Sequence, residues 1–159
     1  AAYPSVLAER TGWKVVNAGI SGETSSQIAA RLPGLIGEHQ PALVILCAGG
    51  NDWLQRKSAQ AVQADINGML QVCKSQAIPV LLVAVPELSL SAALTGRMKD
   101  HAIYKTLAED KKVPLLADAW SNVLSDSALR ADQVHANAAG YARFTELLVA
   151  QVKASGFLA

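Results

Sequence analysis

The chain has 159 residues, of which 51% are hydrophobic and 17% charged, with a formal net charge of +1. This length predicts a single domain over residues 1–159 with a substantial buried core, and the composition argues against a disordered chain. A net charge near zero predicts no binding to nucleic acid. No apolar run approaches the ~20 residues that a transmembrane helix needs. We therefore expect a globular domain whose function depends on a few specific side chains.

Short apolar runs alternate with helical patterns along the chain. Four runs rich in Val, Leu and Ile are predicted strands: Lys14–Ile20, Ala42–Ala48, Pro79–Val85 and Val113–Ala117. Continuous apolar runs of this length are typical of strands covered on both faces, as in a parallel sheet. The alternation predicts an α/β fold with a doubly wound sheet.

Apolar residues at helical spacing predict helices between and after these strands. Pro33 interrupts the first of them and predicts that a second, offset helix begins there. Ser58 and Asn137 are the expected N-caps of two later helices. The apolar stripes run over residues 28–36, 62–73, 103–107 and 141–152. Cys47 and Cys73 are expected to be buried thiols, with a disulfide between them as the alternative.

Three short segments carry side chains suited to catalysis, and each follows an apolar run. They are Gly19-Ile20-Ser21-Gly22, Gly49-Gly50-Asn51-Asp52 and Asp132-Gln133-Val134-His135. In open α/β sheets, ligands bind outside the carboxyl ends of the strands. We therefore expect the three segments to converge there.

Asp132 and His135 are three residues apart, just before the last predicted helix. A turn can bring the carboxylate to Nδ1 of the imidazole, where it fixes the tautomer and stabilises the imidazolium that forms during catalysis. The alternative is an exposed acid followed by a histidine that caps the helix.

Asn51 and Gly22 are candidates for an oxyanion hole. The side-chain amide of Asn51 can donate a hydrogen bond to a developing negative charge. Gly22 has no Cβ, so a substrate carbonyl can approach its backbone N–H. The alternative is that both residues serve ordinary turns. Asp52 is expected to cap a helix or support the site.

These segments resemble the second, third and fifth sequence blocks of the SGNH (GDSL-type) hydrolases, which are serine esterases, lipases and thioesterases. Asn17–Ser25 is similar, nearly residue for residue, to block two of the bacterial periplasmic thioesterase, lysophospholipase and arylesterase group. Tyr3-Pro4, Arg31-Leu32-Pro33 and His39-Gln40-Pro41 match the same group, and the resemblance covers essentially the whole chain. His135 is followed by Ala136, where the family commonly has proline.

The resemblance implies a three-layer α/β/α, flavodoxin-like fold with a parallel sheet in the order 2-1-3-4-5. Lys14–Ile20 would be the second strand. The first, central strand and the block with the nucleophilic serine are missing from this chain. We expect roughly 15–25 further residues upstream to supply both. The alternative is a rearranged sheet, in which a second copy lends the strand.

The resemblance assigns catalysis to Asp132 and His135 and the oxyanion hole to Gly22 and Asn51, with no metal and no cofactor. Ser21 is a weaker candidate for the nucleophile, because its segment is one residue short of the Gly-x-Ser-x-Gly elbow.

The expected reaction is hydrolysis of small-molecule carboxylic esters or thioesters through an acyl-enzyme. An acyl pocket could be lined by Trp53, Leu88, Leu90 and Leu94, although these could equally be partly exposed loop residues. The irregular stretch Leu88–Arg97 is the expected loop over the site. The alternatives are a carbohydrate O-acetyl esterase and a non-catalytic fragment. The resemblance points to a periplasmic or secreted protein, and the sequence leaves localisation and oligomeric state open.

Overall fold

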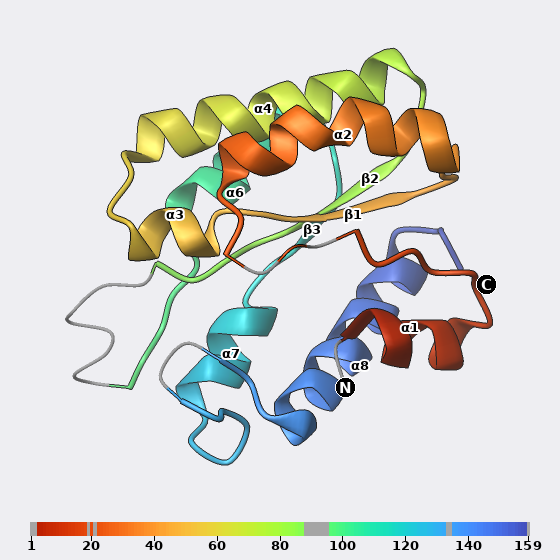
Figure 1. Cartoon of the computed structure of the whole chain (residues 1–159). Helices are drawn as coiled ribbons and strands as arrows, with labels where there is room; N and C mark the ends of the chain where they lie inside the picture. The colour runs from red at the N-terminus through yellow and green to blue at the C-terminus, as the bar shows by residue number, and fades with distance from the viewer. Residues whose placement is uncertain (1–2, 19, 21, 88–95, 133–134, 159) are drawn as a thin grey trace. The chain divides into compact units, whose positions relative to one another are not determined.

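The computed structural model of the chain describes residues 3–18, 20, 22–87, 96–132 and 135–158 (Figure 1). The chain divides into two compact units. The first, which we call the helical unit, comprises Ala1–Asn17, Pro86–Asp100 and Leu116–Ala159. The second, the sheet unit, comprises Ala18–Val85 and His101–Leu115. The single domain over residues 1–159 stays a prediction.

Parallel strands form the centre of the sheet unit. β1 (Val44–Cys47) pairs with β2 (Val80–Val83) in parallel, with Val44 opposite Val80. β3 (Leu115–Leu116) completes a sheet in the order β1-β2-β3. All four residues of β2 are buried, as expected for a strand covered on both faces. The three later strand predictions are therefore confirmed, and their order agrees with the 3-4-5 part of the predicted sheet.

The predicted strand over Lys14–Ile20 is wrong, because none of its described residues lies in a strand. Val16 is 46% exposed and Ile20 is 56% exposed. A strand is stabilised by backbone hydrogen bonds to a neighbour, and apolar composition alone does not supply one. In the fold that the sequence resembles, that neighbour is expected to be the first strand.

The helices described in the sheet unit are α2 (Ser25–His39), α3 (Gly50–Leu54), α4 (Ala59–Ser75) and α6 (Ala102–Lys111). In Figure 1, α2 and α4 run side by side, and α4 also packs against α6. The predicted stripe of α4 is confirmed, since Val62, Ile66, Met69, Leu70 and Cys73 are all buried. Ser58 is its N-cap, with Oγ accepting the Ala61 N–H at 3.2 Å.

α2 runs without a break through Pro33, so the predicted start of a second helix is wrong. Proline removes one backbone hydrogen bond of a helix. Pro33 and Gly34 are exposed, whereas Leu32 and Ile36 are buried. Water can therefore replace the missing backbone hydrogen bond, while the packing of Leu32 and Ile36 holds the helix together.

The helical unit contains α1 (Tyr3–Thr11), α7 (Ala119–Ser125) and α8 (Ala138–Ala154), with α8 packed against both of the others. The expected N-cap is confirmed, because Asn137 Oδ1 accepts the Gly140 N–H at 2.9 Å. Among the described residues, no helix is long and apolar enough to cross a bilayer.

The two cysteines carry thiols and form no disulfide. Cys73 is buried as expected, and burial raises the pKa of its thiol. This thiol therefore stays protonated near neutral pH and is a poor nucleophile. Cys47 is only half-buried, which corrects the expectation for that residue, because the face of β1 on which it lies is incompletely covered.

Candidate active site

Gly22 lies in a tight turn that leads into α2. The Glu23 N–H donates to the Ile20 carbonyl at 3.2 Å, and Gly22 has φ +82°. This backbone conformation strongly favours glycine. Among the described residues other than Gly22 and its two chain neighbours, no heavy atom lies within 4 Å of the position that a Cβ of Gly22 would take. A ligand can therefore approach the main chain there.

Asn51 follows β1 and lies in the first turn of α3. The preceding Gly49 has φ +117°, and the Tyr104 hydroxyl occupies the place that a Cβ of Gly49 would need. That hydroxyl donates to the Ala48 carbonyl at 2.5 Å. The end of β1 is thereby packed so closely that only glycine fits at position 49.

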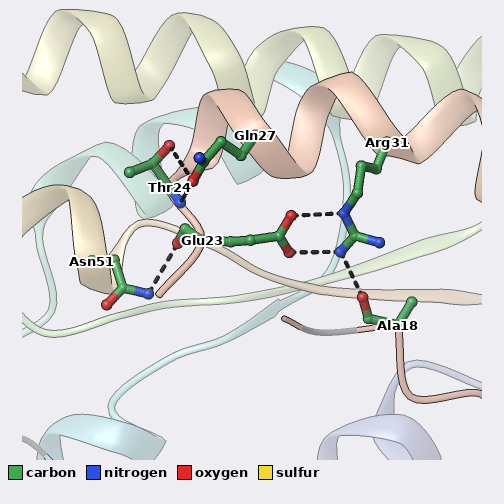
Figure 2. Close-up of polar contacts among 6 residues, drawn as sticks. All are labelled: Ala18, Glu23, Thr24, Gln27, Arg31 and Asn51. Atoms are coloured by element: carbon green, nitrogen blue, oxygen red, sulfur yellow. Dashed lines mark hydrogen bonds and ion pairs between the residues drawn. The ribbon is translucent and has the colours of Figure 1, made fainter. Parts of the chain in front are cut away.

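The side chain of Asn51 contacts the Gly22 turn directly. Its Nδ2 donates to the Glu23 carbonyl oxygen at 2.9 Å (Figure 2). A side-chain amide carries two N–H groups, so this bond orients the amide and the second N–H remains as a further donor. The structure thus brings Asn51 together with the residue that follows Gly22.

Asp52 joins α3 to the start of α2. It is only 1% exposed, and its carboxylate accepts from the Ser25 N–H at 2.7 Å and from Ser25 Oγ at 2.8 Å. Ser25 is the first residue of α2, so Asp52 caps this helix from a neighbouring element. In addition, Thr24 and Gln27 form a capping box, in which the Thr24 N–H donates to Gln27 Oε1 at 2.9 Å (Figure 2). The start of α2 is therefore fixed both by Asp52 and by the capping box of Thr24 and Gln27.

Glu23 and Arg31 form a bidentate ion pair beside the same turn. Arg31 Nε and Nη2 each donate to one Glu23 carboxylate oxygen at 2.6 Å, and Nη2 also donates to the Ala18 carbonyl at 2.6 Å (Figure 2). The Glu23 side chain is 10% exposed and that of Arg31 is 31% exposed. The hydrogen bonds from Arg31 lower the pKa of Glu23, and those to Glu23 raise the pKa of Arg31.

The lowered pKa of Glu23 predicts how stability depends on pH. A carboxylate whose pKa is lower in the folded state contributes stability that is fully present above its ordinary value of 4.5 and is lost as the pH falls through the folded value. We expect the difference in unfolding free energy between the wild type and Glu23→Gln to be constant from pH 6 to 8 and to shrink below pH 4.5. Urea unfolding at a series of pH values measures it. A difference that stays unchanged down to pH 3 would contradict this prediction.

Asp132 and His135 lie together in the helical unit, just before α8. The His135 Nδ1 is 2.9 Å from Asp132 Oδ2 and 3.0 Å from Oδ1, and the His135 N–H donates to Oδ1 at 2.8 Å. The side chain of His135 is 66% exposed and that of Asp132 is 58% exposed. The Ala131 N–H donates to the His135 carbonyl at 2.8 Å, which closes the turn. The carboxylate is thus placed to fix the tautomer with a proton on Nδ1, leaving Nε2 as the basic nitrogen.

The structure places the predicted site residues in two groups. Gly22 and Asn51 belong to the sheet unit, whereas Asp132 and His135 belong to the helical unit. The alternative that His135 caps the last helix is wrong, because Asn137 is the N-cap of α8. The convergence of the two pairs and their catalytic roles stay predictions.

Trp53 is buried, with 8% exposure, and its indole stacks on the His101 ring at a centroid distance of 4.2 Å. The alternative of a partly exposed loop residue is therefore wrong for Trp53, and its role in an acyl pocket stays a prediction. The other candidates for that pocket, Leu88, Leu90 and Leu94, lie outside the described residues, as does Ser21.

Sequence reasoning did not single out Glu23, Arg31 or Ser25. Glu23 lies in a turn and Arg31 lies on a helix, so no regular sequence spacing predicts that their side chains meet. The signal available in the sequence was that these residues lie in the resembling segments Asn17–Ser25 and Arg31-Leu32-Pro33.

Comparison with known proteins places these features in a family. The model of the GDSL-like Lipase/Acylhydrolase family matches residues 1–143. Thioesterase 1/protease 1/lysophospholipase L1 of Escherichia coli is 37% identical over 142 residues, which cover 86% of this chain and 67% of that enzyme. An arylesterase of Vibrio mimicus is 30% identical over 113 residues, which cover 70% of this chain and 55% of that protein.

A crystal structure of TesA is similar in fold, with a TM-score of 0.84 and 27% sequence identity. The alignment covers 96% of this chain and 88% of that one. This similarity confirms the predicted α/β fold class.

Proposed function

The chain belongs to the GDSL-like Lipase/Acylhydrolase family, which places it among the carboxylic ester hydrolases, and on this premise we propose that it provides most of a serine hydrolase site. The proposed substrates are small-molecule carboxylic esters or thioesters. The observation that carries the proposal is the contact of both Asp132 carboxylate oxygens with Nδ1 of His135. This contact supports a general base whose Nε2 is directed away from its acidic partner.

In the proposed mechanism, a serine outside this chain attacks the acyl carbonyl. Nε2 of His135 takes the hydroxyl proton as the new bond from oxygen to carbon forms. Asp132 stabilises the imidazolium that results. The carbonyl oxygen becomes negative and accepts hydrogen bonds from the Gly22 N–H and from Asn51 Nδ2.

Collapse of this tetrahedral intermediate breaks the bond to the leaving alcohol or thiol. His135 returns its proton to the leaving group, and the acyl group remains on the serine. Water then attacks the acyl-enzyme by the same route, with Nε2 again accepting a proton, and the acid product is released. The residues of this chain thus serve both half-reactions.

The full-length gene product tests the proposal. We expect it to hydrolyse a chromogenic short-chain ester or an acyl thioester and to react with a fluorophosphonate at a serine outside residues 1–159. Peptide mapping of the labelled protein identifies that serine, and Ser21→Ala is the matched control that should leave labelling unchanged. Labelling of Ser21 would move the nucleophile into this chain. A folded protein with neither hydrolysis nor labelling would favour the non-catalytic reading, and activity confined to acetylated xylan would favour the carbohydrate esterase.

A further inference from the structure

We infer that Arg31 is a positioning residue for the oxyanion hole, acting as a clamp on Ala18 and Glu23 at either end of the segment that contains Gly22. This inference rests on the proposed function, because it concerns how the two proposed oxyanion donors are held. Arg31 touches neither Gly22 nor Asn51 in the contacts described above, so its effect would be transmitted through Glu23.

The guanidinium of Arg31 holds two parts of the chain. Arg31 lies on α2, two turns after the helix begins, and its Nη2 donates to both the Ala18 carbonyl and Glu23 Oε1 at 2.6 Å. Its Nε donates to Glu23 Oε2 at the same distance. A planar guanidinium offers these donors in a fixed geometry, whereas a lysine ammonium is a single point charge. Arg31 therefore fixes main chain before Gly22 and a side chain after it.

Glu23 connects Arg31 to Asn51. Its carboxylate is held by Arg31, and its carbonyl oxygen accepts from Asn51 Nδ2 at 2.9 Å (Figure 2). The amide of Asn51 is thus oriented by a residue whose own position depends on Arg31. Gly22 directly precedes Glu23, so both proposed donors are tied to the same residue. A displacement of about 1 Å in such a site can cost up to about 100-fold in rate.

The pair of Glu23 and Arg31 differs from an ordinary surface ion pair. The Glu23 side chain is 10% exposed and makes two contacts with Arg31. On α8, Arg143 and Glu146 make a single contact at 3.3 Å, and their side chains are 54% and 48% exposed. An exposed pair of that kind contributes little. The Arg143–Glu146 pair therefore provides matched control substitutions in the same chain.

The test compares Arg31→Lys and Glu23→Gln with Arg143→Lys and Glu146→Gln in the full-length gene product. We expect Arg31→Lys to lower kcat by about 10- to 100-fold with KM changed by no more than about twofold, because donors to the oxyanion act mainly in the transition state. Glu23→Gln should lower kcat in the same direction, and the two control variants should match the wild type. Urea unfolding of each variant shows whether the protein is folded under the assay conditions.

The outcomes distinguish this inference from the proposed function. If His135→Ala and Asn51→Ala abolish or slow hydrolysis while Arg31→Lys and Glu23→Gln keep the wild-type kcat, the clamp is rejected and the hydrolase proposal stands. A loss that appears in KM alone, or one equalled by Arg143→Lys, also rejects the clamp. If His135→Ala and Asn51→Ala hydrolyse esters at the wild-type rate, the proposed function itself fails.

Discussion

Replacing His135 with alanine in the full-length gene product is expected to lower kcat for ester hydrolysis by about 10⁴- to 10⁶-fold. The reason is that the serine hydroxyl loses the base that accepts its proton, and the leaving group loses its acid. Asp132 contacts Nδ1, on the side of the ring away from Nε2. Its carboxylate therefore cannot replace the imidazole as the base that accepts the serine proton. Steady-state hydrolysis of a chromogenic ester measures the change.

The matched control for this prediction is His39→Ala, since His39 is the exposed last residue of α2 and lies outside the proposed site. It should leave kcat within about twofold of the wild type. Asp132→Asn should also lower kcat, by about 10⁴-fold, because an amide no longer stabilises the imidazolium and favours the wrong tautomer. Full activity of His135→Ala would remove the general base from the proposed mechanism.

Asn51→Ala is expected to lower kcat by about 10²- to 10³-fold, equivalent to about 2.7–4 kcal/mol of transition-state stabilisation. The substitution removes the amide that is oriented by the Glu23 carbonyl. It leaves the buried Asp52 in place, so the link from α3 to Ser25 persists. The variant should therefore fold and bind substrate with a KM close to that of the wild type.

Asn122 on α7 provides the matched control, because it is exposed and outside the proposed site. Asn122→Ala should match the wild-type kcat. An equal fall in the two variants would show that the Asn51 result reflects general loss of structure. A fall in Asn51→Ala that appears only as a raised KM would assign Asn51 to substrate binding instead of the oxyanion hole.

Local patterns in the sequence predicted local structure well. The buried stripe of α4 and its Ser58 cap depend on residues within a few turns of each other, so their spacing was sufficient. The contact of Asp132 with His135 is also local, because the two residues are only three positions apart in the sequence. The resemblance added the order of the later strands, which composition alone does not determine.

Predictions that depended on distant partners were less successful. Lys14–Ile20 has the composition of a strand, but no pairing is formed by its described residues. Pro33 was expected to break α2, yet its exposed position allows the helix to continue. The clamp of Arg31 was not anticipated, because it needs the turn and the helix to be folded before the two charges meet. In each case the outcome depends on the folded surroundings of the residue, which the spacing of residues in the sequence does not reveal.

The turn at Gly22 has a consequence for mutational scanning. Its proposed hydrogen-bond donor is a peptide N–H, and every amino acid except proline supplies one. An alanine scan therefore cannot remove this N–H, however much it contributes to catalysis. What a substitution at Gly22 changes is the backbone shape, since φ is +82° there. The donor can be removed cleanly only by chemical means, such as replacing that amide with an ester linkage in a semisynthetic protein.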